Sequence, residues 1–406
     1  MSPYRLYLLI CGLGSFAGTT AFTLNLVYQA TVVGLSPLQL VLVGTVMEGV
    51  CFVAQVPTGV IADVVSRRLS VIVGYLLMGA GLLVWGFFPS FGAILVANVV
   101  WSIGAVCVDG AEEAWAADEI GPDRVSSAFV RGGQAGQAGS LLGILASVAL
   151  AAAGLAAPIV AGGVLTLALG VLLMVFMKEE AWSPSETRGS WRSMGRQVVA
   201  GGRAVRGSAL LGGIVAGTFF VGLSSEGFDR LSQPFLLPMI GDRPIELVFG
   251  ALAMAAALGS IIVTGLVGRR LDTARPRHAG RVLAAVDALT AAGMIGFGLT
   301  GGLWPAVPLY LLVRLLRNTA TPITNVWLVS ATTAGSRATV FSIQAQADAL
   351  GQIAGGPPVG VVAQRRSLGA GLSVAGLFLV PAVALFALAA RRSEPVRADV
   401  VVEPLA

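Results

Sequence analysis

The stretch Thr58-Gly-Val-Ile-Ala-Asp-Val-Val-Ser-Arg-Arg68 lies between two long apolar segments. It carries one carboxylate, Asp63, and two arginines, Arg67 and Arg68, in a turn too short to form a domain. Lys and Arg collect in the cytoplasmic loops of membrane proteins because they are hard to translocate. This stretch therefore predicts a tight cytoplasmic turn between two membrane-spanning helices.

The composition of the chain agrees with a membrane protein. Of its 406 residues, 56% are hydrophobic and 12% are charged, too few charges to cover the surface of a soluble protein. The basic balance, a net charge of +5, says little about nucleic acid in such a chain, and we expect no nucleic-acid partner. The three cysteines lie in apolar segments and His278 lies in a basic loop, so we expect no disulfide, metal site or cofactor.

Twelve apolar segments are long enough to cross a bilayer as helices. Their expected limits are 5–29, 38–62, 69–88, 91–117, 127–153, 157–177, 208–232, 245–267, 280–300, 304–330, 339–363 and 369–390. We therefore expect an all-α integral membrane protein with an N-terminal six-helix bundle (1–177) and a C-terminal one (208–390). A cytoplasmic linker (178–207) joins the bundles, and residues 391–406 form a cytoplasmic tail.

The basic residues predict the orientation. Most of them fall in segments that are cytoplasmic if the amino terminus is inside, and Arg365 and Arg366 are the clear exception. This bias predicts that both termini are cytoplasmic. We expect a multi-pass protein of a plasma membrane, and usage rich in Ala, Gly and Arg indicates a bacterial source.

The two halves carry an internal repeat. At an offset of 212 residues, six residues of the first half meet identical residues in the second. The pairs are Trp115 and Trp327, Phe129 and Phe341, Gln134 and Gln346, Ala135 and Ala347, Gly139 and Gly351, and Gly143 and Gly355. A separate echo of the opening turn, Gly265 to Arg270, follows the eighth segment.

The opening turn resembles the signature loop of the major facilitator superfamily, Gly-x-x-x-Asp-(Arg/Lys)-x-Gly-(Arg/Lys)-(Arg/Lys). Gly59, Asp63, Arg67 and Arg68 match that pattern, whereas Val64 and Ser66 replace a basic residue and a glycine. The resemblance covers the whole chain and implies two parallel six-helix halves that work by alternating access. It also implies that Asp63 helps to hold the halves together in the outward-facing state, with the basic residues of its loop and Asp118. The expected gating loop is Gly59, Asp63, Arg67, Arg68 and Asp118.

Ionisable residues inside a bilayer are functional candidates because charge is costly there. Asp109, Glu112 and Glu113 cluster in the fourth segment, and spacings of three and four place Asp109 on one helical face with both glutamates. Repulsion among three carboxylates favours protonation of at least one of them. Together with the isolated Glu48, they are the proton-coupling candidates; the alternative is that the cluster faces cytoplasmic water.

A second set of residues is expected to line a substrate cavity. Glu226 and Arg230, near the outer end of the seventh segment, are one turn apart and are expected to neutralise each other. Arg314 is expected to face the cavity and to pair with a carboxylate of the N-terminal half, or to form a purely structural bridge. Asp287 is a weaker candidate, because its helix is peripheral in the family that the loop resembles. The cavity candidates are Glu226, Asp229, Arg314, Gln134, Gln137, Gln344 and Asp348.

Glycines crowd the fifth and eleventh segments, where small residues allow helices to approach closely. Gly139-Ser-Leu-Leu-Gly143 keeps the glycines of the Gly-x-x-x-Gly-Pro motif of the drug:proton antiporter branch but lacks its proline, and the fourth segment lacks that branch's arginine. The leading hypothesis is proton-coupled efflux of an amphipathic, drug-like molecule by a monomer, an antiporter of the multidrug-resistance kind. The alternative is proton-coupled import of a small polar or anionic nutrient. Neither His-Glu-x-x-His nor Gly-x-Ser-x-Gly occurs, so an enzyme is not expected.

Overall fold

The computed structural model describes residues 1–181, 202–203, 205–270, 276–332 and 334–392. Its helices are α1 (Pro3–Phe22), α2 (Asn25–Thr31), α3 (Pro37–Val64), α4 (Arg67–Phe87), α5 (Phe91–Val108), α6 (Ala111–Ile120), α7 (Pro122–Ala151), α8 (Ala157–Phe176), α10 (Ala209–Ile240), α11 (Ile245–Arg270), α12 (Pro276–Gly298), α13 (Leu303–Ser330), α14 (Ala334–Arg365) and α15 (Leu368–Arg392). Most of the predicted linker, the tail from residue 393 and the side chains of Arg269 and Arg270 lie outside the described residues.

These helices form the twelve predicted membrane spans. Ten stretches of the described residues are long and apolar enough to cross a membrane; α1 with α2 and α5 with α6 each form one of them. The remaining two spans are α13 and α14, which carry more polar residues. α10 ends at Ile240, eight residues beyond the predicted end at 232, and it contains Pro234 and Pro238. Proline is tolerated in membrane helices because neighbouring groups satisfy the freed carbonyls.

Side-chain caps mark where several spans begin. Ser36 accepts a hydrogen bond from the backbone N–H of Gln39, and the Gln39 side chain accepts one from the backbone N–H of Ser36. The hydroxyls of Ser66, Ser90 and Ser208 cap α4, α5 and α10 in the same way. Each cap satisfies a backbone donor that the first helical turn leaves without a partner.

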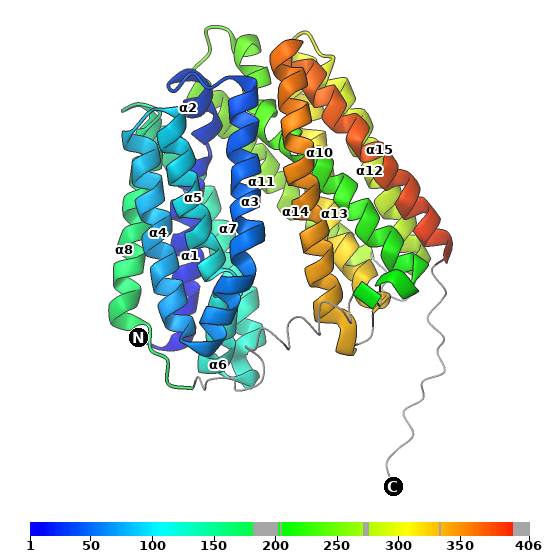
Figure 1. The fold of residues 1–406 in the computed structure, drawn as a ribbon. Coiled ribbons are helices and arrows are strands. Elements are labelled where there is room, and N and C mark those ends of the chain that lie inside the picture. Colours follow the sequence, from blue (N-terminus) through cyan, green and yellow to red (C-terminus); the bar gives the residue numbers. More distant parts are fainter. Residues whose placement is uncertain (182–201, 204, 271–275, 333, 393–406) are drawn as a thin grey trace.

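The two halves repeat one packing pattern (Figure 1). In the N-terminal half α1 packs on α7 and α4 on α8, and in the C-terminal half α10 packs on α14 and α12 on α15. The repeated glycines lie at these contacts. Gly139 faces the backbone of Gly12 and Phe16 on α1, and Gly351 faces the backbone of Phe219 and Leu223 on α10. The repeat in sequence is thus a repeat in packing.

The halves meet most closely at the end where α3 begins and α7 ends. There Gly356 and Gly360 of α14 pack on the first turns of α3, and Gly250 of α11 packs on Val148 of α7. The halves diverge toward the opposite end, which carries the α3–α4 loop, α6, the start of α1 and the end of α15 (Figure 1). We call this opposite end the linker end.

Candidate substrate cavities and proton site

Three cavities are lined by most of the proton-coupling and substrate-cavity candidates. The α3 cavity, of about 680 Å³, is lined from α3, α4, α5, α6 and, across the interface, α14. The α7 cavity, of about 1020 Å³, is lined from α1, α4, α6, α7 and, across the interface, α11. The C-bundle cavity, of about 360 Å³, lies within the C-terminal half between α10, α12, α13, α14 and α15.

The α3 cavity combines aromatic and thioether side chains with carboxylates. Its apolar lining includes Met47, Phe52, Met78 and Trp101. Its carboxylates come from four helices or helix ends, and they are Glu48, Asp109, Glu113 and Asp348. The described residues that line it include no Lys, Arg or His. This lining is apolar and electronegative, the combination that suits an amphipathic cation.

The prediction that Asp109 shares one helical face with Glu112 and Glu113 is wrong. α5 ends at Val108, Asp109 has ψ of 123°, and Gly110 has φ of +75°, a conformation that suits glycine because it lacks a Cβ. The break in the helix turns the three carboxylates apart. Asp109 and Glu113 are exposed in the α3 cavity, whereas Glu112 is buried against the α7 cavity.

Glu112 is the one of these three carboxylates that packing removes from water. Its exposed fraction is 9%, and its Oε2 accepts a hydrogen bond of 3.0 Å from the hydroxyl of Tyr75 on α4. It has no ion pair among the described residues. A buried carboxylate with one neutral donor is poised to hold a proton. The sequence gave no signal for Tyr75, which lies in an apolar segment.

A polar chain crosses between the halves beside the α3 cavity. Gln55 of α3 donates a hydrogen bond of 3.2 Å to Asp109, and Gln346 of α14 donates one of 3.4 Å to the Gln55 carbonyl oxygen. Gln55 was missed from the sequence. Glu48 lines the same cavity and has no ion pair among the described residues.

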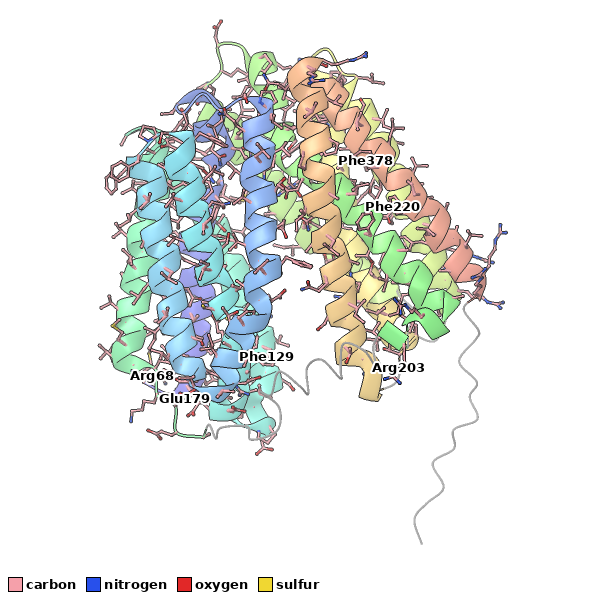
Figure 2. The ribbon with its side chains drawn as sticks, viewed as in Figure 1. Arg68, Phe129, Glu179, Arg203, Phe220 and Phe378 are labelled. Atoms are coloured by element: carbon pink, nitrogen blue, oxygen red, sulfur yellow. The ribbon has the colours of Figure 1, made fainter. Side chains whose placement is uncertain are left out.

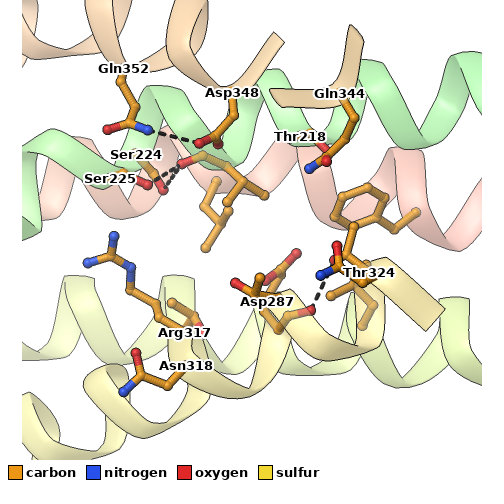
Figure 3. Close-up of a pocket in the computed structure, with 18 of the residues that line it drawn as sticks. Thr218, Ser224, Ser225, Asp287, Arg317, Asn318, Thr324, Gln344, Asp348 and Gln352 are labelled. Atoms are coloured by element: carbon orange, nitrogen blue, oxygen red, sulfur yellow. Dashed lines mark hydrogen bonds between the residues drawn. The ribbon is translucent and has the colours of Figure 1, made fainter. Parts of the chain in front are cut away.

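The C-bundle cavity contains a strong ion pair, and Figure 3 shows one of its members, Arg317, in the cavity. Both terminal nitrogens of Arg317 on α13 donate to the Asp229 carboxylate on α10, at 2.6 and 2.7 Å. Asp348 accepts a hydrogen bond of 2.8 Å from Gln352, one turn along α14. Arg314 lines this cavity of the C-terminal half rather than a cavity between the halves, its buried Nε has no partner, and it forms no ion pair among the described residues. The cation that is paired here is Arg317, through a carboxylate of its own half.

The expectation that Asp287 is peripheral is wrong. Its side chain lies in the C-bundle cavity, the residue is 3% exposed, and its Oδ2 has no hydrogen-bond partner. The face of α12 that carries Asp287 also carries Thr290, three residues further on, so both point to the cavity rather than to lipid.

The Glu226–Arg230 pair forms as predicted, with 3.2 Å between Oε2 and Nε. Because α10 extends to Ile240, the pair lies near the middle of its helix rather than near the end. It packs against Gly44 of α3, where a side chain would collide with both residues. The pair is therefore part of the contact between the halves.

The glutamine candidates separate into two groups. Gln137 lines the α7 cavity, and Gln344 lines both the α3 and C-bundle cavities. Gln134 is exposed on α7 and lines none of these three cavities.

The gating-loop residues are tied together at the linker end. Arg67 forms ion pairs with Asp63 and Asp118 and donates to the Ala114 carbonyl on α6. Glu179, just after α8, accepts hydrogen bonds from the Ser66 hydroxyl at 2.6 Å and from the backbone N–H groups of Arg67 and Arg68 at 2.8 and 3.1 Å. Figure 2 shows Arg68 and Glu179 together at this end.

All of these loop contacts lie within the N-terminal half and the start of the linker. A Cβ atom added at Gly59 would have no neighbouring atom within 4 Å. The role of Asp63 between the halves stays a prediction.

Comparison with known proteins agrees with this architecture. The family model described as Major Facilitator Superfamily matches residues 8–356. A Bacillus subtilis (strain 168) protein described as the uncharacterized MFS-type transporter YxaM is 23% identical over 360 residues, covering 86% of this chain and 87% of its own length.

Solved transporter structures share the fold. A bacterial homologue of the human lysosomal transporter Spinster, in an inward-facing and unoccupied conformation, has a TM-score of 0.74 at 16% identity, covering 96% of both chains. The nucleoside transporter NupG has a TM-score of 0.77 at 12% identity, covering 97% of this chain and 99% of its own. The chain belongs to the major facilitator superfamily and is a multi-pass secondary transporter, not an enzyme.

Proposed function

We propose that this transporter exports amphipathic cations in exchange for protons. The observation that carries the proposal is the α3 cavity, in which Trp, Phe and Met side chains surround four carboxylates and no basic residue. Aromatic faces and carboxylates attract a cation together, and thioethers adapt to substrates of different shape. The cavity draws on both halves, so rocking of one half against the other would change its lining.

We assign the coupling proton to Glu112. α6 separates the two inter-half cavities, because Glu112 faces the α7 cavity while its neighbour Glu113 faces the α3 cavity. A cation that binds beside Glu113 places positive charge one residue from Glu112. That charge favours the ionised carboxylate and hence release of its proton.

The orientation and surroundings follow from the same proposal. With both termini cytoplasmic in a bacterial plasma membrane, the divergent linker end faces the cytoplasm, and the cavities load from the inside. The protein acts as a monomer, since each chain holds both halves that line the cavities. Asp63 and its loop would then close the linker end when the halves rock together.

Everted membrane vesicles provide the test. We expect cationic dyes such as ethidium to elicit proton movement in vesicles that contain the transporter. Glu112→Gln is expected to abolish this response, because the amide cannot take up or release a proton, while ethidium binding to the purified variant is retained. Tyr75→Phe, which keeps the carboxylate but removes its hydrogen bond, is expected to lower the response only in part. Asp123→Asn, at an exposed site on α7, is the matched control and should behave as wild type.

A second function is favoured by the C-bundle cavity, where Arg314 has an unpartnered buried nitrogen. A guanidinium in a polar cavity of this size suits a small anionic nutrient. Proton-coupled import of such a molecule is the alternative. Retained binding of a small carboxylate or phosphate compound, with no response to any cationic dye, would replace the export proposal with import.

A further inference from the structure

Three buried threonines of the C-bundle cavity offer their hydroxyl oxygens to it as hydrogen-bond acceptors. Thr218 of α10, Thr290 of α12 and Thr324 of α13 line it and are 4%, 2% and 8% exposed. Each hydroxyl donates its single proton to the carbonyl four residues earlier, at 3.0, 2.8 and 3.0 Å. A threonine hydroxyl has one proton and two lone pairs. What these three side chains can offer to the cavity is therefore lone pairs.

Asp287 lines the same cavity. Gly293 of α12 packs on Val313 of α13, and Gly280 packs on Trp327. These antiparallel helices therefore place Asp287, midway between the two glycines, level with the middle of that stretch of α13, within about one turn of both Arg317 and Thr324. Figure 3 shows Asp287, Thr324, Thr218 and Gln344 toward one side of the cavity.

No described group of the protein neutralises the charge of the Asp287 carboxylate. It forms no ion pair or hydrogen bond with the described residues, and its Oδ2 is completely enclosed. Arg317, which lies within about one turn of the level of Asp287, is already bound by two hydrogen bonds to Asp229. A bare charge in a membrane interior is costly. A proton on the carboxylate or a positive partner in the niche removes this cost.

We propose that this niche, made by Asp287, Thr218, Thr290 and Thr324, binds a monovalent cation. One carboxylate with neutral hydroxyl oxygens supplies a single negative charge, whereas sites for Mg²⁺ and Ca²⁺ usually use more carboxylates. No group of three or more metal-binding His, Cys, Asp or Glu side chains occurs in the described part of the chain. The cation is either a free sodium ion or the ammonium group of a substrate, because both interact with the lone pairs of carboxylate and hydroxyl oxygens.

The site is distinct from the export machinery proposed above. It lies inside the C-terminal half, and none of its four residues lines the α3 or α7 cavity. Cation binding to this site can be measured without transport, so the test of the site does not depend on proton-coupled export.

Thermal unfolding of the purified full-length protein tests the proposal. Melting temperatures are compared in sodium chloride, methylammonium chloride and choline chloride at one ionic strength and one pH. Choline is the reference, since its quaternary nitrogen has no N–H donor and is too bulky for the niche. We expect sodium or methylammonium to raise the melting temperature above the choline value. Stabilisation by sodium identifies a free-ion site, and stabilisation by methylammonium alone identifies an ammonium site.

Variants assign the effect to the niche. Asp287→Asn is expected to raise the half-maximal cation concentration at least about tenfold, roughly 1.4 kcal/mol of binding free energy. Thr290→Val and Thr324→Val remove one acceptor each without a change in charge and should weaken binding less. They also provide the test if Asp287→Asn does not fold. Asp123→Asn on α7 should bind as wild type. Equal melting temperatures of the wild type in all three salts, or an unchanged cation response in Asp287→Asn or in both threonine variants, would overturn the proposal.

Discussion

The Asp229–Arg317 pair is expected to contribute far more to stability than a surface ion pair. Its two hydrogen bonds, of 2.6 and 2.7 Å, join α10 to α13, and the side chains are 35% and 24% exposed. Hydrogen bonds to charged groups contribute roughly 1.5–3 kcal/mol each, whereas exposed pairs contribute about 0–1 kcal/mol. Since the cavity leaves this pair partly open, we expect a coupling energy of about 2 kcal/mol, between these limits.

A double-mutant cycle measures that coupling. Asp229→Asn and Arg317→Gln should each destabilise the protein by about 2–3 kcal/mol, because each leaves a charge without its partner in the bundle. The double variant should lose clearly less than the two single losses together. Equilibrium unfolding of the purified protein in mixed micelles with increasing dodecyl sulfate gives the four free energies.

The chain contains its own comparison pair. Lys178 and Glu180 lie 3.1 Å apart with side chains 74% and 71% exposed, and the same cycle on them should give a coupling below about 0.5 kcal/mol. If the two cycles gave equal couplings, the conclusion that burial in the bundle strengthens the inner pair would be refuted.

Two further predictions concern packing and the loop. Gly351→Ala should destabilise the protein by about 1–3 kcal/mol, because the new Cβ would collide with the α10 backbone. Gly133→Ala is the control and should melt as wild type, because there is open space around Gly133. Similar melting temperatures for the two variants would show that α10 and α14 are not in close contact. Glu179→Gln should cost about 1–2 kcal/mol, because the amide loses the charge that accepts hydrogen bonds at the start of α4. The same micelle unfolding checks it, with Glu180→Gln as the exposed neighbour, and equal losses in both variants would contradict the capping role.

Hydropathy and charge predicted the twelve spans and the two-half architecture, because length and apolarity decide whether a helix can cross a bilayer. The sequence also predicted the Glu226–Arg230 pair, which depends only on helical spacing. It failed where a residue's surroundings come from other helices. Asp287 has no local signal, since its place in the cavity depends on how α12 packs against α13.

Backbone conformation caused the other main error. The spacing of Asp109 and Glu112 predicts one shared face only if the helix is continuous, and Gly110 interrupts it. The predicted seventh span ends at residue 232, whereas α10 continues through Pro234 to Ile240. Gln55 was missed because its role depends on Gln346 of the other half.

The break at Gly110 has a mechanical consequence. α6 is bound at several points to the segment that follows α8: the Trp115 indole donates to the Lys178 carbonyl, and Glu119 accepts from the backbone N–H groups of Glu180 and Ala181. The break at Gly110 separates α6 from α5, and these hydrogen bonds hold α6 to the start of the linker. The same short helix carries Glu112, which is hydrogen-bonded to Tyr75. The connection between the halves is thereby coupled to the carboxylate proposed to hold the proton.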